Sequence, residues 1–592
     1  MSFLLLFLLA AGLNIVLGWH DWPAVLAGSL SDPDSYMRLL RIEQGVQAGH
    51  LVVTVARDDS GAGVYVEWSR LLDALLWLMA APLAPFLGWH KALYAVGVAW
   101  GPLGVGFLGV ALAWAVEPFA ARRYLWTAAA AAGVLPGFTT VAVPGVVHYH
   151  VLLLAMIALT AGCVGRAWRD DRWMGFLAGL SGGFAIWLTP ETMPFILAAY
   201  AVLLLRWWRS KNGMVLLTTA AGCFDVLGFG FFLDPPGGGY GVPAVDRLSY
   251  VYVAMALVLL GGAGALVWLQ TRLRPALATW RGPLGVALLG ALLGGWVAAF
   301  PRVAMGPYGI LPPGEAKAFF GVMTELQPVR GMSLLVFLFP GLCATAYALA
   351  RVLPRRGPDF AAMAAPDMFG MPKRQPLLWA YIAVCGAVTL ALGAKFMLFV
   401  GFSCLLAAAM LPVAMSEMSS RWAARPGRAS FARITALALV LAVPMLGVVA
   451  LPAPRAAAAP AGGAYPSCAL RHAAPLLALA EGQVVLAQVE DTPELLYRSQ
   501  VETVGSLYQH GIPGYLRDRA AWRVVPGEKV PPEVSATAAR FVLFCPMAGR
   551  YALVRDLPKT TLWDALEAGT VPPWLSLAGS NVDGWRLYKI TP

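Results

Sequence analysis

The sequence predicts an α-helical polytopic membrane protein with a small α/β domain near its C-terminus. Of the 592 residues, 59% are hydrophobic and only 13% are charged, and the mean hydropathy is +0.67. Soluble globular proteins are about half apolar and a quarter charged. The 62 Gly and 44 Pro fit the prediction, because both residues are frequent in membrane helices. A cytosolic enzyme, a disordered scaffold and a disulfide-rich secreted domain are therefore excluded.

The basic residues are distributed as expected for a membrane protein. The net charge is +11, but Lys and Arg occur in short clusters between apolar runs, without a nucleic-acid-binding motif. Such clusters are typical of the cytoplasmic loops of membrane proteins. We therefore expect membrane lipid, and no nucleic acid, among the partners.

Apolar runs long enough to cross roughly 30 Å of hydrocarbon follow one another along the chain. The first has no early Lys or Arg and no small-residue cleavage site, so we expect an anchor and not a removable signal. In all we expect about 13 transmembrane helices, at residues 3–18, 93–115, 124–143, 150–165, 173–189, 192–206, 214–233, 250–270, 283–300, 333–352, 377–394, 396–415 and 432–451.

The apolar run 71–89 is left out of these spans because of the charges of the later loops. If this run crossed the membrane, every later basic cluster would change sides. If it lies on the surface or re-enters, six loops with roughly 20 Lys and Arg fall on the cytoplasmic side, and the loops between spans on the other side, apart from the long first loop, carry about five. The N-terminus is then cytoplasmic and the C-terminal region extracytoplasmic.

Three outer segments are too long to be simple connections, and they define the expected organisation. Residues 1–451 form the transmembrane domain, which includes the first outer loop (19–92) and the fifth (301–332). An Ala/Pro-rich linker at 452–466 leads to an α/β domain at 467–592.

The expected C-terminal domain contains both strand-like and helical patterns. Residues 493–509 (PELLYRSQVETVGSLYQ) predict a helix. Cys468 and Cys545 lie in this polar region, where they form either a disulfide or two buried thiols. Three runs predict short strands: QVVLAQV (483–489), FVLFCPM (541–547) and YALVRDL (551–557).

Charged residues beside a membrane are costly, and they mark candidate functional sites. In SDPDSYMRLLRIEQ, directly after the first span, Asp32 and Asp34 flank Pro33. An extended backbone there would turn both carboxylates to one side, where they suit a hard cation such as Mg²⁺ or Mn²⁺. The alternative is an Asp that caps a surface helix.

A second candidate is the pair His148 and His150, at the outer boundary where the fourth span begins. In an extended segment, residues two apart share a face, so both imidazoles would be able to bind one metal. The alternative is two side chains that only line the membrane interface.

Three further charges lie in outer loops or close to an outer boundary. Glu325, in GVMTELQPVRG, is either functional or a solvated loop acid, and Glu191 is expected to cap a span. Lys395, in LGAKFMLF, interrupts two apolar runs where an anionic phosphate would be met, or it extends to the interface as an ordinary loop lysine.

These residues, in this order, resemble the catalytic subunit of the oligosaccharyltransferases, within the C-type (GT-C) membrane glycosyltransferases. The resemblance implies a GT-C-like fold with thirteen spans, long first and fifth outer loops and an extracytoplasmic C-terminal domain. The stretch from Asp32 to Arg38 resembles the DPxxxxR motif, whose Asp binds the metal, and Gly63 to Asp73 (GVYVEWSRLLD) resembles a downstream G-x-x-x-x-W segment.

The later motifs also follow the family. His148 and His150 occupy the place of the second acidic motif, which in archaeal members can read Asp-x-His. TELQP (324–328) resembles SVSEHQP, whose Glu lies beside the metal and the acceptor. Lys395 falls near a basic residue that meets the lipid-linked phosphate.

A closer resemblance links the chain to bacterial membrane proteins with DDYMRL, HWSRLVD and DHH motifs. This chain has DSYMRL, EWSRLLD and HYH, so His148 replaces an acid. The C-terminal region has no WWDYG motif, which argues against transfer to an Asn sequon.

The resemblance implies a metal-dependent glycosyltransferase of the bacterial inner membrane, active on the periplasmic side. It would transfer a sugar or oligosaccharide from a polyprenyl-(pyro)phosphate donor to a glycan, lipid or protein acceptor. Asp32 and Glu325 would be catalytic, and Arg38 and Lys395 would bind the donor phosphate. Asp32, Asp34, His148, His150 and Glu325 would hold Mg²⁺ or Mn²⁺.

Two other hypotheses remain. A transporter or flippase for lipid-linked sugars would need polar groups at mid-membrane, for which Asp225 is the main candidate. A non-catalytic relative would keep the fold and bind a glycolipid.

Overall fold

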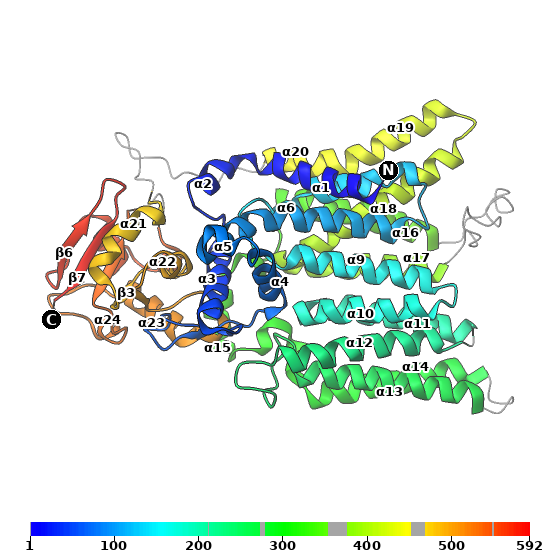
Figure 1. Ribbon diagram of the computed structural model, residues 1–592, viewed down its shortest axis with the longest axis horizontal. Coiled ribbons are helices and arrows are strands. Elements are labelled where there is room, and N and C mark those ends of the chain that lie inside the picture. Colours follow the sequence, from blue (N-terminus) through cyan, green and yellow to red (C-terminus); the bar gives the residue numbers. More distant parts are fainter. Residues whose placement is uncertain are drawn as a thin grey trace.

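The structure is a computed structural model that describes residues 2–210, 212–272, 279–352, 376–450, 468–546 and 550–591. The expected linker at 452–466 lies outside these residues. Long helices lying side by side make up most of the chain (Figure 1). They are α1 (Phe3–Leu17), α6 (Trp89–Val116), α9 (His150–Ala167), α10 (Arg172–Leu188), α11 (Met193–Ser210), α12 (Met214–Leu233), α13 (Tyr250–Arg272), α14 (Arg281–Ala299), α16 (Phe339–Val352), α17 (Pro376–Lys395), α18 (Val400–Arg421), α19 (Pro426–Leu437) and α20 (Val443–Ala450).

Within the described residues, ten helical segments are long and apolar enough to cross a membrane. The chain is therefore of the multi-pass type, and thirteen crossings remain a prediction. Residues 124–143 are interrupted, as α7 (Trp126–Val134) and α8 (Pro136–Thr139), because a residue before proline disfavours the helical conformation and Leu135 is extended. Two more of the expected spans are not among the ten segments. They are α10, which has only 17 residues, and α11, which contains the charged residues Arg206 and Arg209.

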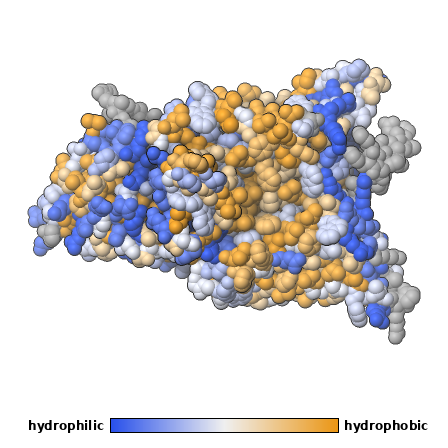
Figure 2. All heavy atoms as spheres, in the orientation of Figure 1, coloured by the Kyte–Doolittle hydropathy of each residue, from blue (hydrophilic) through white to orange (hydrophobic). Residues whose placement is uncertain are grey.

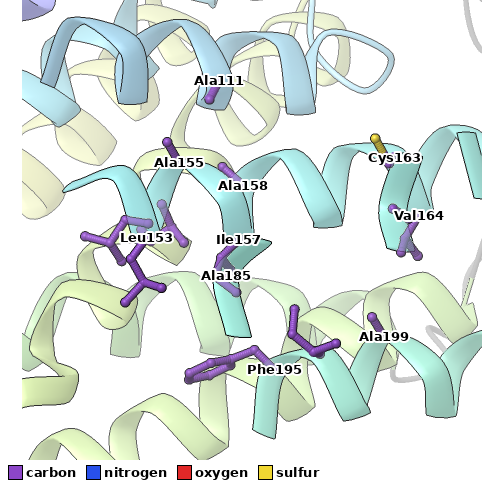
Figure 3. Packing of buried hydrophobic residues seen from close by; sticks show 14 of the residues in the cluster. Ala111, Leu153, Ala155, Ile157, Ala158, Cys163, Val164, Ala185, Phe195 and Ala199 are labelled. Carbon is purple, nitrogen blue, oxygen red and sulfur yellow. The ribbon is translucent and has the colours of Figure 1, made fainter. Parts of the chain in front are cut away.

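Small residues allow the central helices to pack closely. Buried side chains of α6, α9, α10 and α11 meet in one hydrophobic cluster (Figure 3). Between α10 and α12, Gly179 lies against the backbone of Thr219, and Gly222 lies against the backbone of Phe176. A side chain at either glycine would collide with a carbonyl oxygen, so this helix contact requires glycine.

The first outer loop folds across one end of the bundle, which we call the site end. In Figure 1, α3 stands across the direction of the bundle helices. The apolar run 71–89 is divided mainly between α4, with 11 residues, and α5, with four, and neither can cross a membrane. The elements of this loop are α2 (Trp22–Leu26), α3 (Pro33–Ala48), β1 (Thr54–Val55), β2 (Val64–Tyr65), α4 (Arg70–Ala80) and α5 (Ala84–Leu87).

The surface of the molecule is divided into an apolar band and two polar ends (Figure 2). The band covers the long helices. Basic residues occupy the last turns of helices that start at the site end, among them Arg166 of α9, Arg209 of α11 and Arg421 of α18. The end opposite the site is therefore strongly basic.

Residues 468–591 contain a five-stranded mixed sheet with the order β4-β3-β5-β7-β6. β3 pairs in parallel with β4 and β5, and β7 pairs antiparallel with β5 and β6. The strands are β3 (Val484–Leu486), β4 (Glu502–Thr503), β5 (Phe541–Phe544), β6 (Leu575–Ser580) and β7 (Arg586–Ile590). The helices are α21 (Leu470–Leu477), α22 (Thr492–Arg498), α23 (Ile512–Arg523), α24 (Pro532–Ser535) and α25 (Leu562–Glu567).

The structure corrects three local predictions for this region. The expected strand at 551–557 is a 3₁₀ turn, η13 (Ala552–Val554). The expected helix at 493–509 ends at Arg498, and the chain continues as β4 and a loop, since Glu502 and Thr503 pair with β3. The hairpin of β6 and β7 was not predicted.

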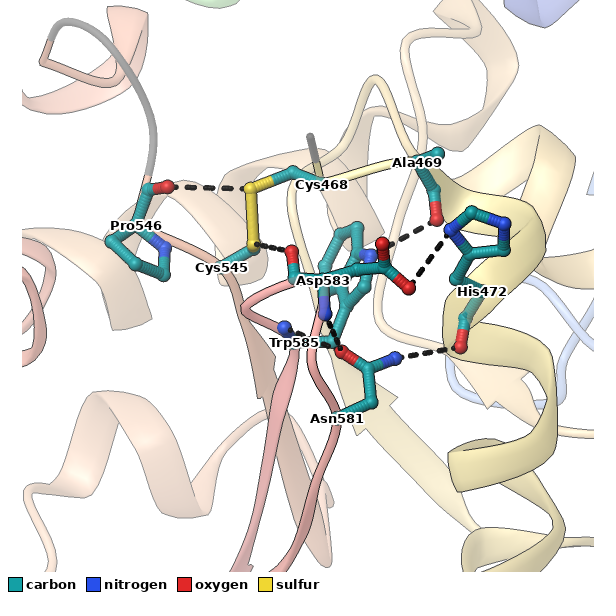
Figure 4. The surroundings of a disulfide bond; sticks show 8 residues. All are labelled: Cys468, Ala469, His472, Cys545, Pro546, Asn581, Asp583 and Trp585. Carbon is teal, nitrogen blue, oxygen red and sulfur yellow. Dashed lines mark hydrogen bonds and ion pairs between the residues drawn. A yellow bond between two sulfur atoms is a disulfide. The ribbon is translucent and has the colours of Figure 1, made fainter. Parts of the chain in front are cut away.

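A disulfide joins Cys468 and Cys545, whose Cα atoms are 6.0 Å apart. Beside it, the side-chain amide of Asn581 donates a hydrogen bond to the carbonyl of His472, and Trp585 Nε1 donates to the carbonyl of Ala469 (Figure 4). The start of α21 is thereby fastened to strand β5 and to the β6–β7 hairpin.

The C-terminal region contacts the first outer loop through a strained turn. Arg57, Asp59 and Ser60 have positive φ angles, which are unfavourable for residues other than glycine. The Arg57 guanidinium donates hydrogen bonds to carbonyls on α22 and after it, at Leu496, Ser499 and Val501. The turn therefore holds the C-terminal region over the site end.

Candidate metal centre

Asp32 is both the N-cap of α3 and a member of the candidate site. Its carboxylate accepts hydrogen bonds from the Ser35 amide at 2.9 Å and from the Ser35 hydroxyl at 2.6 Å. Asp34 lies in the first turn of α3, where the helix dipole favours a negative charge. Asp32 therefore caps the helix and is also a candidate site residue, so the two interpretations do not exclude each other. The backbone that was expected to be extended around Pro33 is extended only at Asp32, because Pro33 begins the helix.

His148 approaches the two carboxylates from the loop before α9. Its Nε2 lies 3.0 Å from Asp32 Oδ1 and 3.9 Å from Asp34 Oδ2. Two hydrogen bonds position this loop: Trp100 Nε1 donates to the His148 carbonyl, and the Val147 amide donates to the Ser35 hydroxyl. Packing against α3 and α6 therefore fixes the His148 ring.

The neighbouring carboxylates favour positive charge at His148, and His148 in turn favours negative charge at Asp32. Burial alone would lower the pKa of His148, but Asp32, with help from Asp34 and Glu325, raises it to about 9. Burial would raise the pKa of Asp32, but His148 and the hydrogen bonds from Ser35 outweigh it and hold that pKa below its usual value.

The donor set of these residues fits a divalent cation. One ligand atom from each of Asp32, Asp34 and His148 lies within 4.8 Å of the others. Carboxylate oxygens with an imidazole nitrogen suit Mn²⁺, and carboxylates suit Mg²⁺. Nδ1 of His148 is buried, and no residue in the described part of the chain forms a hydrogen bond with it.

His150 and Glu325 lie beside this group and are not part of it. Both line a cavity of about 170 Å³ between α9, α18 and the fifth outer loop. His150 begins α9, and its ring centroid is 5.4 Å from that of His148. Both of its ring nitrogens are buried, with no hydrogen-bond partner among the described residues. Although Glu325 is exposed at the surface, desolvation by the surrounding protein raises the pKa of its carboxyl, while His148 lowers it.

Lys395 ends α17 next to this cavity. The next residues form η9 (Met397–Phe399), and both Met397 and Leu398 line the cavity with Glu325. The Met397 amide donates to the Gln327 carbonyl at 3.0 Å, which ties η9 to η6 (Thr324–Leu326). Lys395 itself is exposed, with its ammonium 5.1 Å from the Phe396 ring centroid.

Arg38, expected to bind the donor phosphate, has structural partners instead. Its side chain is 2% exposed, and it donates to Asp73 at 2.8 Å and to the Val147 carbonyl at 3.0 Å. Arg41 donates to the other oxygen of Asp73. A buried guanidinium with these partners joins α3 to α4 and to the His148 loop, so we do not assign Arg38 to the phosphate.

Three residues near the site were not among those predicted. The hydroxyl of Tyr508, from the C-terminal region, donates to Asp34 Oδ1 at 2.9 Å. Burial raises the pKa of Glu67 to about 7 and that of Glu191 to about 8, and Glu325 adds to the shift of Glu191. Glu67 lies in EWSRLLD, a motif that was identified from the sequence, although Glu67 itself was not selected. No sequence motif around Tyr508 indicates that it would reach the site.

No family model matches the chain, and no curated protein sequence matches it. Among solved structures, it is similar to the oligosaccharyltransferase AglB of the archaeon Archaeoglobus fulgidus. The complex of AglB with an inhibitory peptide and a dolichol-phosphate has a TM-score of 0.67 at 14% identity, over 91% of this chain and 69% of that one. The apo form has a TM-score of 0.67 at 15% identity, over 92% and 69% of the two chains. The complex with Zn and sulfate has a TM-score of 0.58 at 15% identity, over 91% and 67%. At these identities the similarity establishes the fold.

Proposed function

We propose that the protein is an oligosaccharyltransferase-like membrane glycosyltransferase. It moves a sugar or oligosaccharide from a polyprenyl-(pyro)phosphate donor to an acceptor on the periplasmic side of a bacterial inner membrane. The observation that carries the proposal is the group of Asp32, Asp34 and His148, beside Glu325 and Lys395, at the end of a fold shared with an oligosaccharyltransferase.

In this proposal Asp32, Asp34 and His148 would hold Mg²⁺ or Mn²⁺, and His150 and Glu325 stand next to them. A bound divalent cation supplies Lewis-acid stabilisation of the negative charge on a departing phosphate. Helix α3 and the loop before α9 bring these ligands together, and Tyr508 orients Asp34.

Glu325 and Lys395 act on the reactants. The Glu325 carboxyl has a raised pKa, and it accepts or shares a proton of the acceptor nucleophile. Lys395 is exposed at the end of α17, two residues before the cavity-lining Met397, and its ammonium is a fixed positive charge suited to the phosphate of the donor. The cavity that Glu325 shares with His150 gives the acceptor a place to approach.

The proposed orientation follows from the charges at the two ends of the bundle. The basic end, with Arg166, Arg209 and Arg421, is placed in the cytoplasm by the positive-inside rule. The site end and residues 468–591 are then periplasmic. A transporter is less well supported, because Asp225, its main mid-membrane candidate, is exposed on α12 and is not buried among the helices.

A mass-spectrometric profile of lipid-linked sugars in the native host tests this function. Strains carrying Asp32→Asn or Glu325→Gln should accumulate one polyprenyl-linked sugar and lose one surface glycan. Glu315→Gln, in the first turn of α15 on the same loop, is the matched control and should behave like wild type. Unchanged lipid and glycan pools in both site variants, at equal protein levels, would refute the catalytic assignment.

A further inference from the structure

A second cavity, of about 490 Å³, lies between the fifth outer loop and the C-terminal region. Its walls come from α15 (Pro313–Phe320), α23 and η13. Figure 1 shows α15 between the bundle and the C-terminal elements, next to α23. The cavity is separate from the candidate metal centre, and no motif in the sequence drew attention to it.

The cavity is lined by an excess of positive charge. Four basic side chains face one acid, and that acid is already paired: Arg523 binds Asp556 through two hydrogen bonds, at 2.9 and 3.0 Å. Lys317, Arg519 and Arg555 have no carboxylate within 4.0 Å among the described residues. Three cations are thus left to attract an anion.

The walls of the cavity are held together by packing. The Tyr515 hydroxyl of α23 donates to the Ala318 carbonyl of α15 at 3.0 Å, and the Tyr515 ring packs edge-on against Phe319. Phe319 and Phe320 are buried in the same hydrophobic cluster as Trp522 of α23. Arg519 and Arg523 project from the same helix, so their separation from Lys317 is set by this interface.

The cavity is also close to Glu325 along the chain. Gly321 and Val322 line its wall, and Glu325 follows three residues after Val322. Three residues span at most about 10 Å. A ligand anchored in the cavity therefore lies against the loop that carries the proposed acceptor-activating carboxyl.

We propose that this cavity binds a phosphate or carboxylate group of the acceptor, so that the acceptor is an anionic glycan or glycolipid. The inference rests on the proposed function and adds the class of the acceptor to it. Arg519 and Arg555 would meet the anion with guanidinium groups, which match phosphate and carboxylate oxygens in pairs, and Lys317 would add a third charge.

Calorimetric titration of the detergent-solubilised full chain with inorganic pyrophosphate, in EDTA, tests the binding site. The wild type should bind, and less tightly at high ionic strength. Arg519→Gln with Arg555→Gln should bind at least about tenfold more weakly. The control Arg540→Gln with Lys589→Gln removes the same charge from the sheet and should bind like wild type. Equal binding by the cavity variant, or none by the wild type, would overturn the site.

The source of the anion is tested in the host. The cavity variant should accumulate the same lipid-linked sugar, and lose the same surface glycan, as Glu325→Gln. Weakened pyrophosphate binding with an unchanged glycan profile would overturn the acceptor assignment. If Glu325→Gln itself leaves both pools unchanged, the proposed transferase function fails, and the titration still decides whether the cavity binds anions.

Discussion

Single residues at the site end serve two purposes at once, and Asp32 shows how. Its carboxylate caps α3 through Ser35 while the same oxygen atoms face His148. Asp34 is similarly placed between His148 and the Tyr508 hydroxyl. Because the capping and positioning bonds fix the carboxylates before any ligand arrives, little conformational entropy is lost on binding a cation.

Tyr508→Phe tests this pre-organisation. Removal of the hydroxyl leaves Asp34 Oδ1 without its donor, so we expect the affinity for Mn²⁺ to fall about 10-fold or more while the fold is retained. Titration calorimetry with Mn²⁺ on the purified protein measures the change. Tyr588→Phe, a buried tyrosine of β7 remote from Asp34, is the matched control. Equal affinities in both variants would show that Tyr508 does not orient the carboxylate.

At the scale of elements, α3 is attached to α4 by a buried ion-pair network. Asp73 accepts from Arg38 and Arg41, and all three side chains are at most 2% exposed. The network also reaches the His148 loop, because Arg38 donates to the Val147 carbonyl. Its geometry therefore determines how the two halves of the candidate metal centre meet.

Asp73→Asn should destabilise this junction strongly. Two buried guanidinium groups would lose their counter-charge, a change that typically costs about 3–5 kcal/mol. Thermal unfolding in detergent, followed by intrinsic tryptophan fluorescence, should show a clear fall in the midpoint. Asp170→Asn is a suitable comparison, because that acid also pairs with an arginine but is 52% exposed, and its loss should change little. A similar small effect for Asp73→Asn would contradict the structural role of the network.

The contact between α10 and α12 allows a second test at this scale. Gly222→Leu would push a side chain into the Phe176 carbonyl, and overpacking of this kind costs about 1–3 kcal/mol. At Gly228, on the same helix, an added Cβ meets no atom within 4 Å, so Gly228→Leu should be tolerated. Thermal stability and monodispersity of the two variants should therefore differ, and matching values would mean that the helices are not closely packed at Gly222.

For the whole molecule, the main consequence of the structure is that one end is built from three distant parts of the chain. The first outer loop, the fifth outer loop and the C-terminal region meet there, through Arg57 on one side and Tyr515 on the other. Both the candidate metal centre and the basic cavity lie at junctions between these parts. Separate expression of the C-terminal region would disrupt both.

The orientation of the molecule is testable with native cysteines. After mild reduction, Cys468, which is partly exposed, should react with a membrane-impermeant maleimide in intact spheroplasts, because the site end is proposed to be periplasmic. A cysteine introduced by Arg421→Cys, at the basic end, should react only after permeabilisation. A cysteine-free variant gives the background. The reverse pattern would invert the proposed topology and place the chemistry in the cytoplasm.

The sequence by itself determined the features that depend on local chemistry. Hydropathy identified the multi-pass class, and the position of charges at span boundaries selected Asp32, Asp34, His148, His150, Glu325 and Lys395. The structure brings the first three into one group, places His150 and Glu325 on the adjoining cavity, and leaves Lys395 exposed two residues before the cavity-lining Met397, although the roles of all six remain proposals.

Only the tertiary structure decided which distant residues meet. Tyr508 and Asp34 are 474 positions apart, and Arg38 and Asp73 are separated by the two short strands of the first loop. Periodicity reports which face of a helix is apolar, but the partner of a buried charge depends on how the helices pack. For the same reason the C-terminal end of α22 escaped prediction, because the pairing of Glu502 and Thr503 with β3 overrides local helical propensity. The hairpin of β6 and β7 is held in the sheet by the pairing of β7 with β5, which lies more distant in the chain.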